Sequence, residues 1–303
     1  MGIKFPKVRP GTGRSEHPAA GQLAVLSTAI LWSSSGLFIK LLDWHPIVIT
    51  SVRSYIAVIF LLVLRFIFPP PSKAKNQPLP LWIGAFAFSF TMFSFVVSNR
   101  LTTAANAIML QYGAPVWAAF LAWWLLKERP RWEHWGALVL VFMGLLLFFR
   151  DSLGTGARGT GALAGDLLSI ASGISFGLYS ILLRKLKDFN PRDIMLLGHV
   201  VSAFLGIPFI ILYPPSLNPT SIGIILYMGI IQIGLTSVLF VYGMKRVRAI
   251  QAMLIATIEP ILSPVWVFII LREIPTLTAL AGGTIIIATV LASSIIGWRR
   301  EEI

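Results

Sequence analysis

The sequence contains the same pattern twice, and this internal repeat limits the possible folds more than any other feature. In each copy a proline is followed by an apolar run that ends in a basic residue and a glutamate. The copies are offset by about 145 residues, and the matching pairs are Pro115 with Pro260, Lys127 with Arg272, and Glu128 with Glu273. We therefore expect the chain to fold as two related halves.

Composition indicates that most of the chain faces lipid rather than water. Hydrophobic residues make up 56% of the chain, charged residues make up 12%, and the mean hydropathy is +0.80. A soluble protein carries about 25% charged residues, so this chain cannot cover itself with polar surface. It contains no cysteine, which excludes disulfides, thiolate zinc sites and thiol redox chemistry.

Ten apolar segments are long enough to cross a bilayer, which takes about 20 residues in a helix. We expect all of them to be helices, because open strands would leave backbone groups unpaired in lipid. The predicted fold is therefore an all-α integral membrane protein with ten transmembrane helices. The segments lie at approximately residues 21–42, 46–68, 79–98, 102–126, 132–149, 161–184, 192–213, 219–243, 249–271 and 276–297.

An odd number of spans in each copy means that the second copy enters the bilayer from the opposite side. Many secondary transporters build alternating access on inverted repeats of this kind. The sequence therefore predicts two inverted five-helix repeats. The expected divisions are a basic tail at 1–20, a first repeat at 21–150, a Gly-rich linker at 151–160, a second repeat at 161–298 and a short tail at 299–303.

The lysines and arginines fall mainly on one side of the predicted bilayer. Nineteen of the 25 lie on the side of the N-terminus, four lie on the other side, and Lys40 and Arg53 lie inside spans. The positive-inside rule then places both termini in the cytoplasm and predicts a multi-pass protein of the cell inner membrane. Anionic lipid headgroups explain the net charge of +13, and we expect no nucleic-acid partner.

Pro115 and Pro260 lie near the middle of their predicted helices. A proline inside a helix removes one backbone hydrogen bond and frees the carbonyl four residues earlier, here that of Gln111 or Ala256. A free carbonyl at membrane depth needs protein or a wet cavity around it. The two prolines therefore indicate either simple packing kinks or a polar cavity between the copies.

Glu259 directly precedes Pro260 near the middle of the bilayer, where a carboxylate is costly and marks a candidate functional site. Three roles are open: a site for a coupling proton, a counter-charge for a substrate amine, or an ion-pair partner of Arg53. Arg53 lies about 10 Å deep, since a helix rises about 1.5 Å per residue. The equivalent positions in the other copy are Gly198 and Ala114, so neither charge is duplicated.

Uncharged polar and aromatic side chains in several spans are candidates for contacts with a solute. Some of them are expected only to join helices. A cavity with aromatic walls and a few amide groups, however, suits a small amphipathic molecule. The candidates include Trp32, Ser33, Ser34, Ser35, Asn99, Asn106, Gln111, Tyr112, Ser175, Tyr179, Gln232, Tyr242 and Gln251.

Three further polar residues are expected to have structural roles. Lys40 is expected to extend to the outer interface, and Asp166 is expected to favour the start of the sixth span. His199 is expected to be a paired histidine of the core, with a proton relay as the alternative.

The pattern resembles the EamA-type carriers of the drug/metabolite transporter superfamily over residues 20–298. The segment from Gly165 to Arg184 is similar to the start of that family's second repeat. Further similarities are Ala29–Trp32 with Gly36 and Lys40, Pro46 with Arg53, Pro115 with Lys127-Glu128, and Glu259-Pro260 with Glu273. One departure is His45 before Pro46, where the family often has an acidic residue. The resemblance implies ten spans around a central cavity and transport of amino acids or related metabolites, often outward.

We therefore expect a secondary transporter that exports small organic solutes, with an uptake permease of the same fold as the alternative. The expected partners are a small-molecule substrate, the lipid bilayer and a coupling proton, and the chain is expected to act as a monomer. An intramembrane enzyme is the distant alternative, because no nucleophile with a base, paired carboxylates or metal-ligand cluster is evident. The glycines at 154, 156 and 159 lack the Gly-Lys-Ser/Thr of a phosphate loop, so no cofactor is expected.

Overall fold

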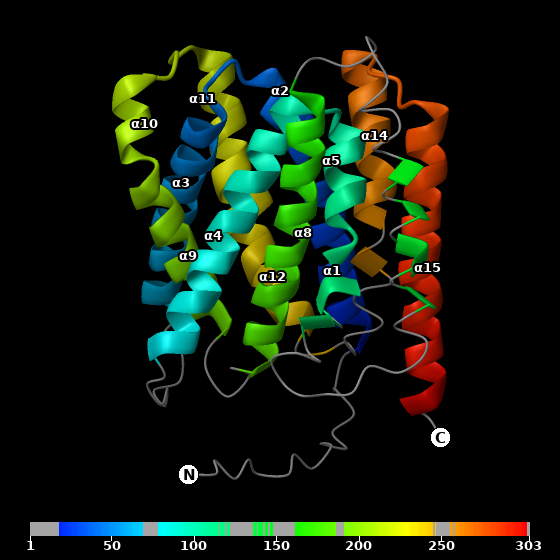
Figure 1. The fold of residues 1–303 in the computed structure, drawn as a ribbon. Helices are drawn as coiled ribbons and strands as arrows, with labels where there is room; N and C mark the ends of the chain where they lie inside the picture. Colours follow the sequence, from blue (N-terminus) through cyan, green and yellow to red (C-terminus); the bar gives the residue numbers. More distant parts are fainter. Residues whose placement is uncertain are drawn as a thin grey trace.

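A computed structural model shows that the chain folds into a bundle of helices (Figure 1). All regular structure in the described part of the chain is helical. The structure describes residues 18–68, 78–114, 116–118, 120–121, 136–137, 139–141, 143–144, 146–147, 161–185, 191–244, 246, 255–256 and 258–301.

Each copy of the repeat contributes its own set of helices to the bundle. Those of the first copy are α1 Pro18–Ser33, α2 Ser35–Leu41, α3 Pro46–Ile67, α4 Pro78–Leu101 and α5 Ala104–Gln111. Those of the second copy are α8 Ala162–Lys185, α9 Pro191–Leu205, α10 Ile207–Leu212, α11 Pro219–Leu226, the π-helix η1 Tyr227–Leu235, α12 Thr236–Met244, α14 Ile258–Leu271 and α15 Leu277–Glu301.

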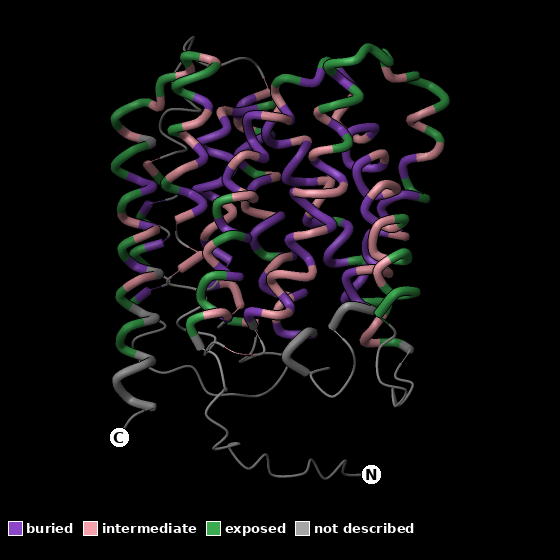
Figure 2. Tube along the Cα trace, turned by 180° about the vertical axis from the view of Figure 1, so that it is seen from behind, coloured by how far each residue is buried: buried purple, intermediate pink, exposed green. Residues whose placement is uncertain are grey.

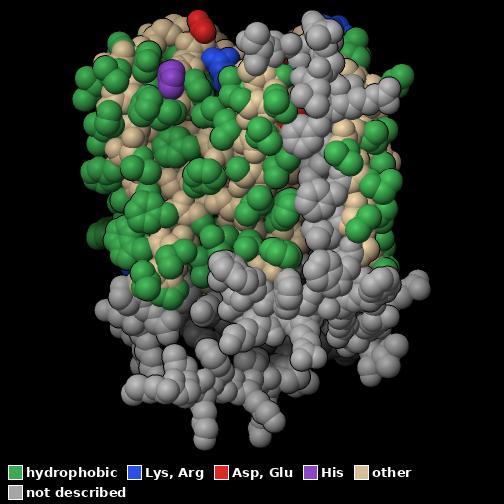
Figure 3. Space-filling model, in the orientation of Figure 1, with side chains coloured by type: hydrophobic (Ala, Val, Ile, Leu, Met, Phe, Trp, Pro, Cys, Tyr) green, Lys and Arg blue, Asp and Glu red, His purple; other side chains and the backbone are tan. Residues whose placement is uncertain are grey.

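Length and apolar composition make this bundle a membrane protein. Hydrophobic side chains cover the coloured side surface in Figure 3, and most charged side chains visible there lie at the upper end. Two shorter apolar helices cover Ile258–Leu271 and Leu280–Thr289. Six described segments are long and apolar enough to cross a bilayer: Ala19–Leu41, Pro46–Ile67, Leu79–Leu101, Ala162–Leu182, Ile194–Leu212 and Pro219–Gly243.

The packed interior joins the two copies into one body. Buried residues line the inside of the bundle and exposed residues lie on its outside (Figure 2). The largest cluster of buried side chains contains Ile39, Ile49 and Ile108 of the first copy together with Met228 and Ile286 of the second. The hydrophobic core is therefore shared between the copies.

The two copies run in opposite directions through the bundle. α1 begins beside the end of α12, where a Cβ on Gly243 would lie 3.0 Å from the carbonyl oxygen of Gly21. α8 begins beside the end of α4, where a Cβ on Gly165 would lie 2.9 Å from the Cβ of Leu101. Because α4 runs in the same direction as α1, the first helices of the two copies start at opposite ends of the molecule (Figure 1).

The first span is broken between α1 and α2, unlike the single helix over 21–42 that its apolar run predicts. Ser33 and Ser34 turn their hydroxyls onto the carbonyls of Ile30 and Leu31, at 2.6 Å and 2.7 Å. Side chains that bond preceding carbonyls compete with the helical hydrogen bonds and bend the helix. The break therefore follows from the serines themselves.

The seventh span is also broken, at Gly206 between α9 and α10. Pro208 has no backbone N–H with which to continue the helix. Ser51 of α3 donates to the carbonyl of Ser202 at 3.1 Å, which gives one carbonyl near the break a partner. A Cβ on Gly206 would overlap both Oγ and Cβ of Ser51. α3 therefore approaches this break only because residue 206 has no side chain.

Replacement of Gly206 by Ala is expected to lower the midpoint of thermal unfolding in detergent, because the added methyl overlaps Ser51. Overpacking of this kind costs about 1–3 kcal/mol. The double variant Ser51→Gly/Gly206→Ala removes the overlapping atoms and should unfold near the midpoint of Ser51→Gly alone. Equal midpoints for Gly206→Ala and the unchanged protein would contradict the close approach.

Candidate functional site

Polar side chains of both copies meet between α1, the end of α5, η1, α12 and α14, and we call this set the central polar layer. Each hydrogen bond that defines it joins a residue of the first copy to a residue of the second. The layer is therefore the polar seam between the copies. Its members are Trp32, Ser33, Ser34, Tyr112, Tyr227, Gln232, Thr236, Glu259 and Trp266.

The break after α1 presents consecutive side chains to the second copy. Trp32 Nε1 donates to Thr236 Oγ1 of α12 at 2.8 Å. Trp266 Nε1 of α14 donates to Ser33 Oγ at 2.9 Å. Two neighbouring residues of one broken helix are thus held by two different helices of the other copy.

The π-helix η1 supplies the contacts to the next residue, Ser34. Gln232 Nε2 donates to Ser34 Oγ at 3.0 Å, and Tyr227 Oη lies 3.2 Å from the same oxygen. Residues five apart lie on one side of a π-helix, whose hydrogen bonds connect i and i+5, and such turns are often found at functional sites. Gln232 is 1% exposed, and its Oε1 has no partner among the described residues. The layer therefore keeps one unused acceptor.

Tyr112 connects the end of α5 to the carboxylate of the second copy. Its hydroxyl lies 2.7 Å from the carbonyl oxygen of Ala256 and 2.9 Å from Glu259 Oε2. Glu259 lies on α14 and is 8% exposed. The carbonyl four residues before Pro260, which the sequence predicts to be free of a helical bond, therefore has its partner in the first copy.

The Tyr112 hydroxyl, the Glu259 carboxyl group and the Ala256 carbonyl share one or two hydrogen-bonding hydrogens, depending on whether Glu259 is protonated. A tyrosine hydroxyl has one hydrogen and accepts through its lone pairs. When Glu259 is protonated, its O–H donates to Tyr112 Oη and Tyr112 donates to Ala256, so every group is paired. When Glu259 is ionised, the single hydrogen of Tyr112 faces two acceptors. The geometry therefore suits a carboxyl group that gains and loses a proton.

The ion pair between Arg53 and Glu259, one of the roles expected for these residues, is not formed in this structure. Arg53 Nη2 lies 3.6 Å from Met92 Sδ on α4, whereas Glu259 bonds to Tyr112. The reason is that α3, which carries Arg53, packs against α4, α9 and η1, while α14 packs against α1 and α5. The similar depth of Arg53 and Glu259 in the bilayer therefore does not bring their side chains together.

Lys40 lies partly exposed at one end of the bundle and pairs there with Glu273 of the second copy, a partner that its position alone did not predict. Lys40 Nζ lies 2.9 Å from Glu273 Oε2, and the two side chains are 21% and 23% exposed. Glu273 Oε1 accepts the backbone N–H of Ala104 at 3.0 Å, and Lys40 donates to the carbonyl of Thr102 at 3.4 Å. We call these four residues the end latch. It joins the copies at the end of the bundle opposite the start of α1.

Two of the candidate solute contacts bind α8 instead. Asn106 Nδ2 donates to Asp166 Oδ1 at 3.1 Å, and Thr102 Oγ1 donates to the same oxygen at 2.7 Å. Gln111 Nε2 donates to Ser172 Oγ at 2.7 Å. Asn106 and Gln111 therefore hold α5 against α8. Asp166 is fully buried and is a hydrogen-bond acceptor between helices, a larger role than favouring the start of a span.

Tyr179 and His199 pack against Phe88 of α4, on other helices than the central polar layer. The ring centroids lie 5.1 Å apart for Tyr179 and 4.8 Å apart for His199. His199 is fully buried, as expected for a core histidine, but it is only partly paired: its Nδ1 lies 3.4 Å from Ser54 Oγ. Within the described residues, the Tyr179 hydroxyl and His199 Nε2 have no hydrogen-bond partner.

Sequence reasoning missed three members of the central polar layer: Tyr227, Thr236 and Trp266. Spacing would have found two of them, since Thr236 lies four residues after Gln232 and Trp266 lies seven after Glu259, on the same helical face. Tyr227 was hidden because its separation of five from Gln232 matches only a π-helix. Two other candidates, Pro115 and Gln251, lie outside the described residues.

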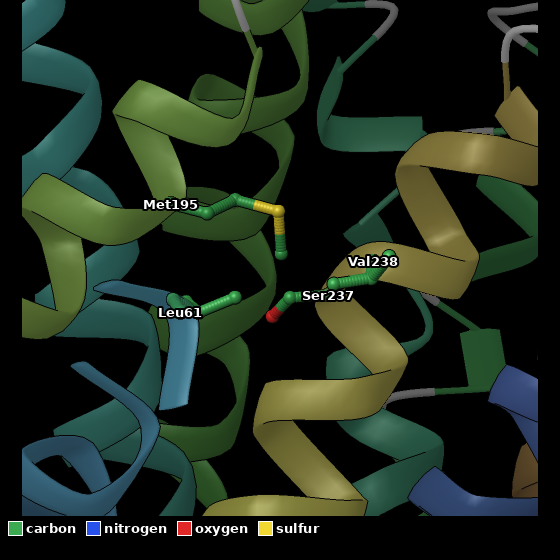
Figure 4. A pocket seen from close by; sticks show the side chains of 4 residues that line it. All are labelled: Leu61, Met195, Ser237 and Val238. Atoms are coloured by element: carbon green, nitrogen blue, oxygen red, sulfur yellow. The ribbon is translucent and has the colours of Figure 1, made fainter. Parts of the chain in front are cut away.

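A small gap between α3, α9 and α12 does not belong to the central polar layer. Leu61, Met195, Ser237 and Val238 line it, and their side chains point toward one another (Figure 4). It has room for roughly one water molecule, and its walls are apolar. It is too small for an organic solute. No group of three or more His, Cys, Asp or Glu residues in the described ranges could hold a metal ion.

Several known transporters resemble this chain along most of their length. An uncharacterized transporter of Archaeoglobus fulgidus is 29% identical over 92% of this chain and 96% of its own length. The uncharacterized transporter YwfM of Bacillus subtilis is 28% identical over 79% of this chain and 81% of its own length. Human solute carrier family 35 member G1 is 22% identical over 94% of this chain and 81% of its own length.

A solved structure and a family sequence profile support the same relationship. A solved crystal structure has a TM-score of 0.66 with this chain at 19% identity and covers 93% of this chain and 99% of its own, which shows the shared fold. The sequence profile of the EamA-like transporter family matches residues 19–150 and again 163–295. The chain therefore belongs to the EamA-like transporter family, a family of membrane transporters and not of enzymes.

Proposed function

We propose that the protein is a secondary transporter that exports small organic solutes, such as amino acids or related metabolites, by alternating access. The observation that carries this proposal is the bonding of Tyr112 in the first copy to Glu259 and Ala256 in the second. A buried carboxyl group at the seam between inverted repeats is where a transporter places its solute and coupling-ion site. Trp32 and Gln232 lie in the same layer and are the proposed solute contacts.

Alternating access requires that one end of the seam closes while the other opens. We propose that the end latch, which joins Lys40 to Glu273 at 2.9 Å, keeps one end of the seam closed. Residues 40–46 and 185–191 share the pattern Lys-Leu-x-Asp-aromatic-x-Pro, which makes Lys185 the equivalent of the latch lysine. Glu128 is the equivalent of the latch glutamate, and both copies have a proline two residues later.

The lysine and the glutamate of the end latch are thus repeated in the sequence at the equivalent positions of the other copy, which supports a role for this pair of residue types in the transport cycle.

The Tyr112–Glu259 contact supports a proton as the coupling ion. Tyr112→Phe removes the hydroxyl and leaves both Ala256 and Glu259 without this partner, and a buried unpaired group costs about 1–3 kcal/mol. We expect at least about a fivefold loss of proton-driven accumulation, because one kcal/mol corresponds to about that factor. The measurement is solute accumulation in liposomes, with Tyr213→Phe at the exposed end of α10 as the control. Full accumulation by Tyr112→Phe would exclude the hydroxyl from coupling.

We also propose that both termini lie in the cytoplasm, which puts the end latch on the outer side of the membrane. The support is the excess of lysine and arginine on the side of the N-terminus. Reporter fusions that fluoresce only in the cytoplasm should be active at either terminus. Activity of a periplasmic reporter at either end would contradict this orientation.

The test of the proposed function is reconstitution into liposomes with a panel of labelled amino acids and amines, with and without a proton gradient. We expect at least one solute to accumulate on the side from which protons leave, as an exporter exchanging solute for protons requires. Accumulation on the side to which protons move would identify an uptake permease instead. Flux no greater than that of protein-free liposomes for the whole panel would overturn the proposal.

A further inference from the structure

Arg53 is a buried cation with no acidic partner among the described residues. It lies on α3 and is 2% exposed. Its Nη2 has only the weak acceptor Met92 Sδ at 3.6 Å, and its Nε has no partner in the described part of the chain. A guanidinium cannot lose its charge in a protein, so it needs an anion or several acceptors when it is removed from water.

The carboxylates that the structure describes inside the bundle are bonded elsewhere. Asp166 bonds to Thr102 and Asn106, and Glu259 bonds to Tyr112. Glu273 belongs to the end latch. None of the three is an ion-pair partner of Arg53, so the protein supplies this cation with no counter-charge among its described residues.

Two other buried groups, of which one lies beside Arg53, also have a polar atom without a partner among the described residues. His199 Nδ1 lies 3.4 Å from the hydroxyl of Ser54, the neighbour of Arg53 on α3. If this hydroxyl donates to Nδ1, the neutral ring carries its hydrogen on Nε2, which has no partner among the described residues. The Tyr179 hydroxyl is a second unused donor. We call Arg53, Tyr179 and His199 the donor cluster.

One face of α4 brings the members of the donor cluster together. The ring of Phe88 contacts the rings of both Tyr179 and His199, with centroids 5.1 Å and 4.8 Å away. Met92, which contacts Arg53, lies one helical turn further along the same face and packs against the same group of buried side chains. All three side chains therefore surround two successive turns of one helix.

The chemistry that completes this cluster is an anion rich in acceptors. Buried donors are nearly always paired in native proteins, so several unpaired donors in one place indicate a group that binds there. A carboxylate accepts about four hydrogen bonds and matches the planar fork of a guanidinium. A neutral amide or an amine offers fewer acceptors and no charge for Arg53.

We propose that the donor cluster binds the carboxylate of the transported solute, with Arg53 as its counter-charge. The proposal rests on the transport function and narrows its substrate class to carboxylate-bearing solutes, such as amino acids and organic acids. Arg53 then has no charge partner among the described residues because its partner arrives with the solute. The equivalent position in the other copy is Gly198, so the repeat supplies this arginine only once.

The test compares each acid with its own amide. Purified protein in detergent is titrated with a panel of amino acids and organic acids and with the matching carboxamides, and binding is followed by the shift of thermal unfolding. We expect acids to bind at least about tenfold more tightly than their amides, a difference that charge-assisted hydrogen bonds readily supply. Arg53→Gln should remove this preference, and Arg53→Lys should keep part of it.

Two further variants keep the test decisive if Arg53→Gln does not fold. Tyr179→Phe and His199→Gln retain the cation and should each weaken acid binding severalfold while amide binding stays unchanged. Arg100→Gln, which removes an arginine that bonds the carbonyls of Leu42 and Trp44 at the end of the bundle, is the control and should keep the preference for acids.

Failure of this inference and failure of the transport function give different results. Equal binding of acids and amides by the unchanged protein overturns the inference while flux in liposomes still supports transport. Arg53-dependent binding of acids without flux in liposomes supports the binding site and overturns the transport function. Absence of binding by every member of the panel overturns the inference.

Discussion

Glu259→Gln is expected to abolish proton-driven accumulation of the solute and to leave exchange of solute across the membrane intact. A carboxamide resembles the protonated carboxyl group, because its NH₂ donates to Tyr112 Oη in place of the acid O–H. The paired arrangement with Ala256 is then fixed in one form. The variant should fold and bind solute but can no longer carry a proton.

The measurement compares accumulation under a pH gradient with counterflow of labelled solute at equal pH. Asp43→Asn removes an exposed carboxylate outside the central polar layer and is the matched control, which should keep both activities. Because Arg53 and Glu259 do not pair, adding Arg53→Gln to the Glu259→Gln variant should not restore proton-driven accumulation. Undiminished pH-driven accumulation by Glu259→Gln would remove this residue from the coupling mechanism.

Loss of the end latch is expected to open the end of the seam that carries Glu273. Lys40→Gln or Glu273→Gln breaks a partly exposed ion pair worth up to about 1 kcal/mol. Glu273→Gln also weakens the bond to the backbone of Ala104. We expect the open population to rise by about fivefold, since that free energy corresponds to about this factor.

Labelling of a single thiol measures this opening, because the chain contains no cysteine of its own. Ser263 is 2% exposed and lies below the end latch, with its Oγ 3.4 Å from the position of a Cβ on Gly36. A membrane-impermeant maleimide added from outside should label Ser263→Cys about fivefold faster in either latch variant. Asp43→Asn should leave the rate unchanged, and equal rates in all variants would show that the latch does not control access.

The fold could be predicted from the sequence because lipid leaves few choices for an apolar chain. Long apolar runs must form helices, and the repeated proline and charge pattern fixes two related halves. The breaks at Ser34 and Gly206 could not be predicted from apolar runs, because they depend on hydroxyls and on the close approach of α3. The π-helix η1 could not be predicted either, because an apolar run of the same composition can form an α-helix or a π-helix.

The sequence predicted those parts of the candidate site that a single residue identifies without knowledge of its neighbours. Glu259 is costly in lipid whatever surrounds it, so its sequence position already indicated a site. Its partner could not be found in this way, because depth along a helix says nothing of the direction in which Arg53 or Tyr112 points. Asn106 and Tyr112 illustrate the limit, since both are polar residues near α5 and only Tyr112 reaches the second copy.

Proton movement caused by solute would show directly whether Glu259 couples a proton to solute transport. Liposomes that contain the protein and an internal pH-sensitive dye are given an outward gradient of a transported solute, with no pH gradient at the start. We expect the interior to become more acidic as solute leaves, and Glu259→Gln to show solute exchange without this acidification. A constant internal pH in the unchanged protein while solute leaves at full rate would contradict proton coupling by Glu259.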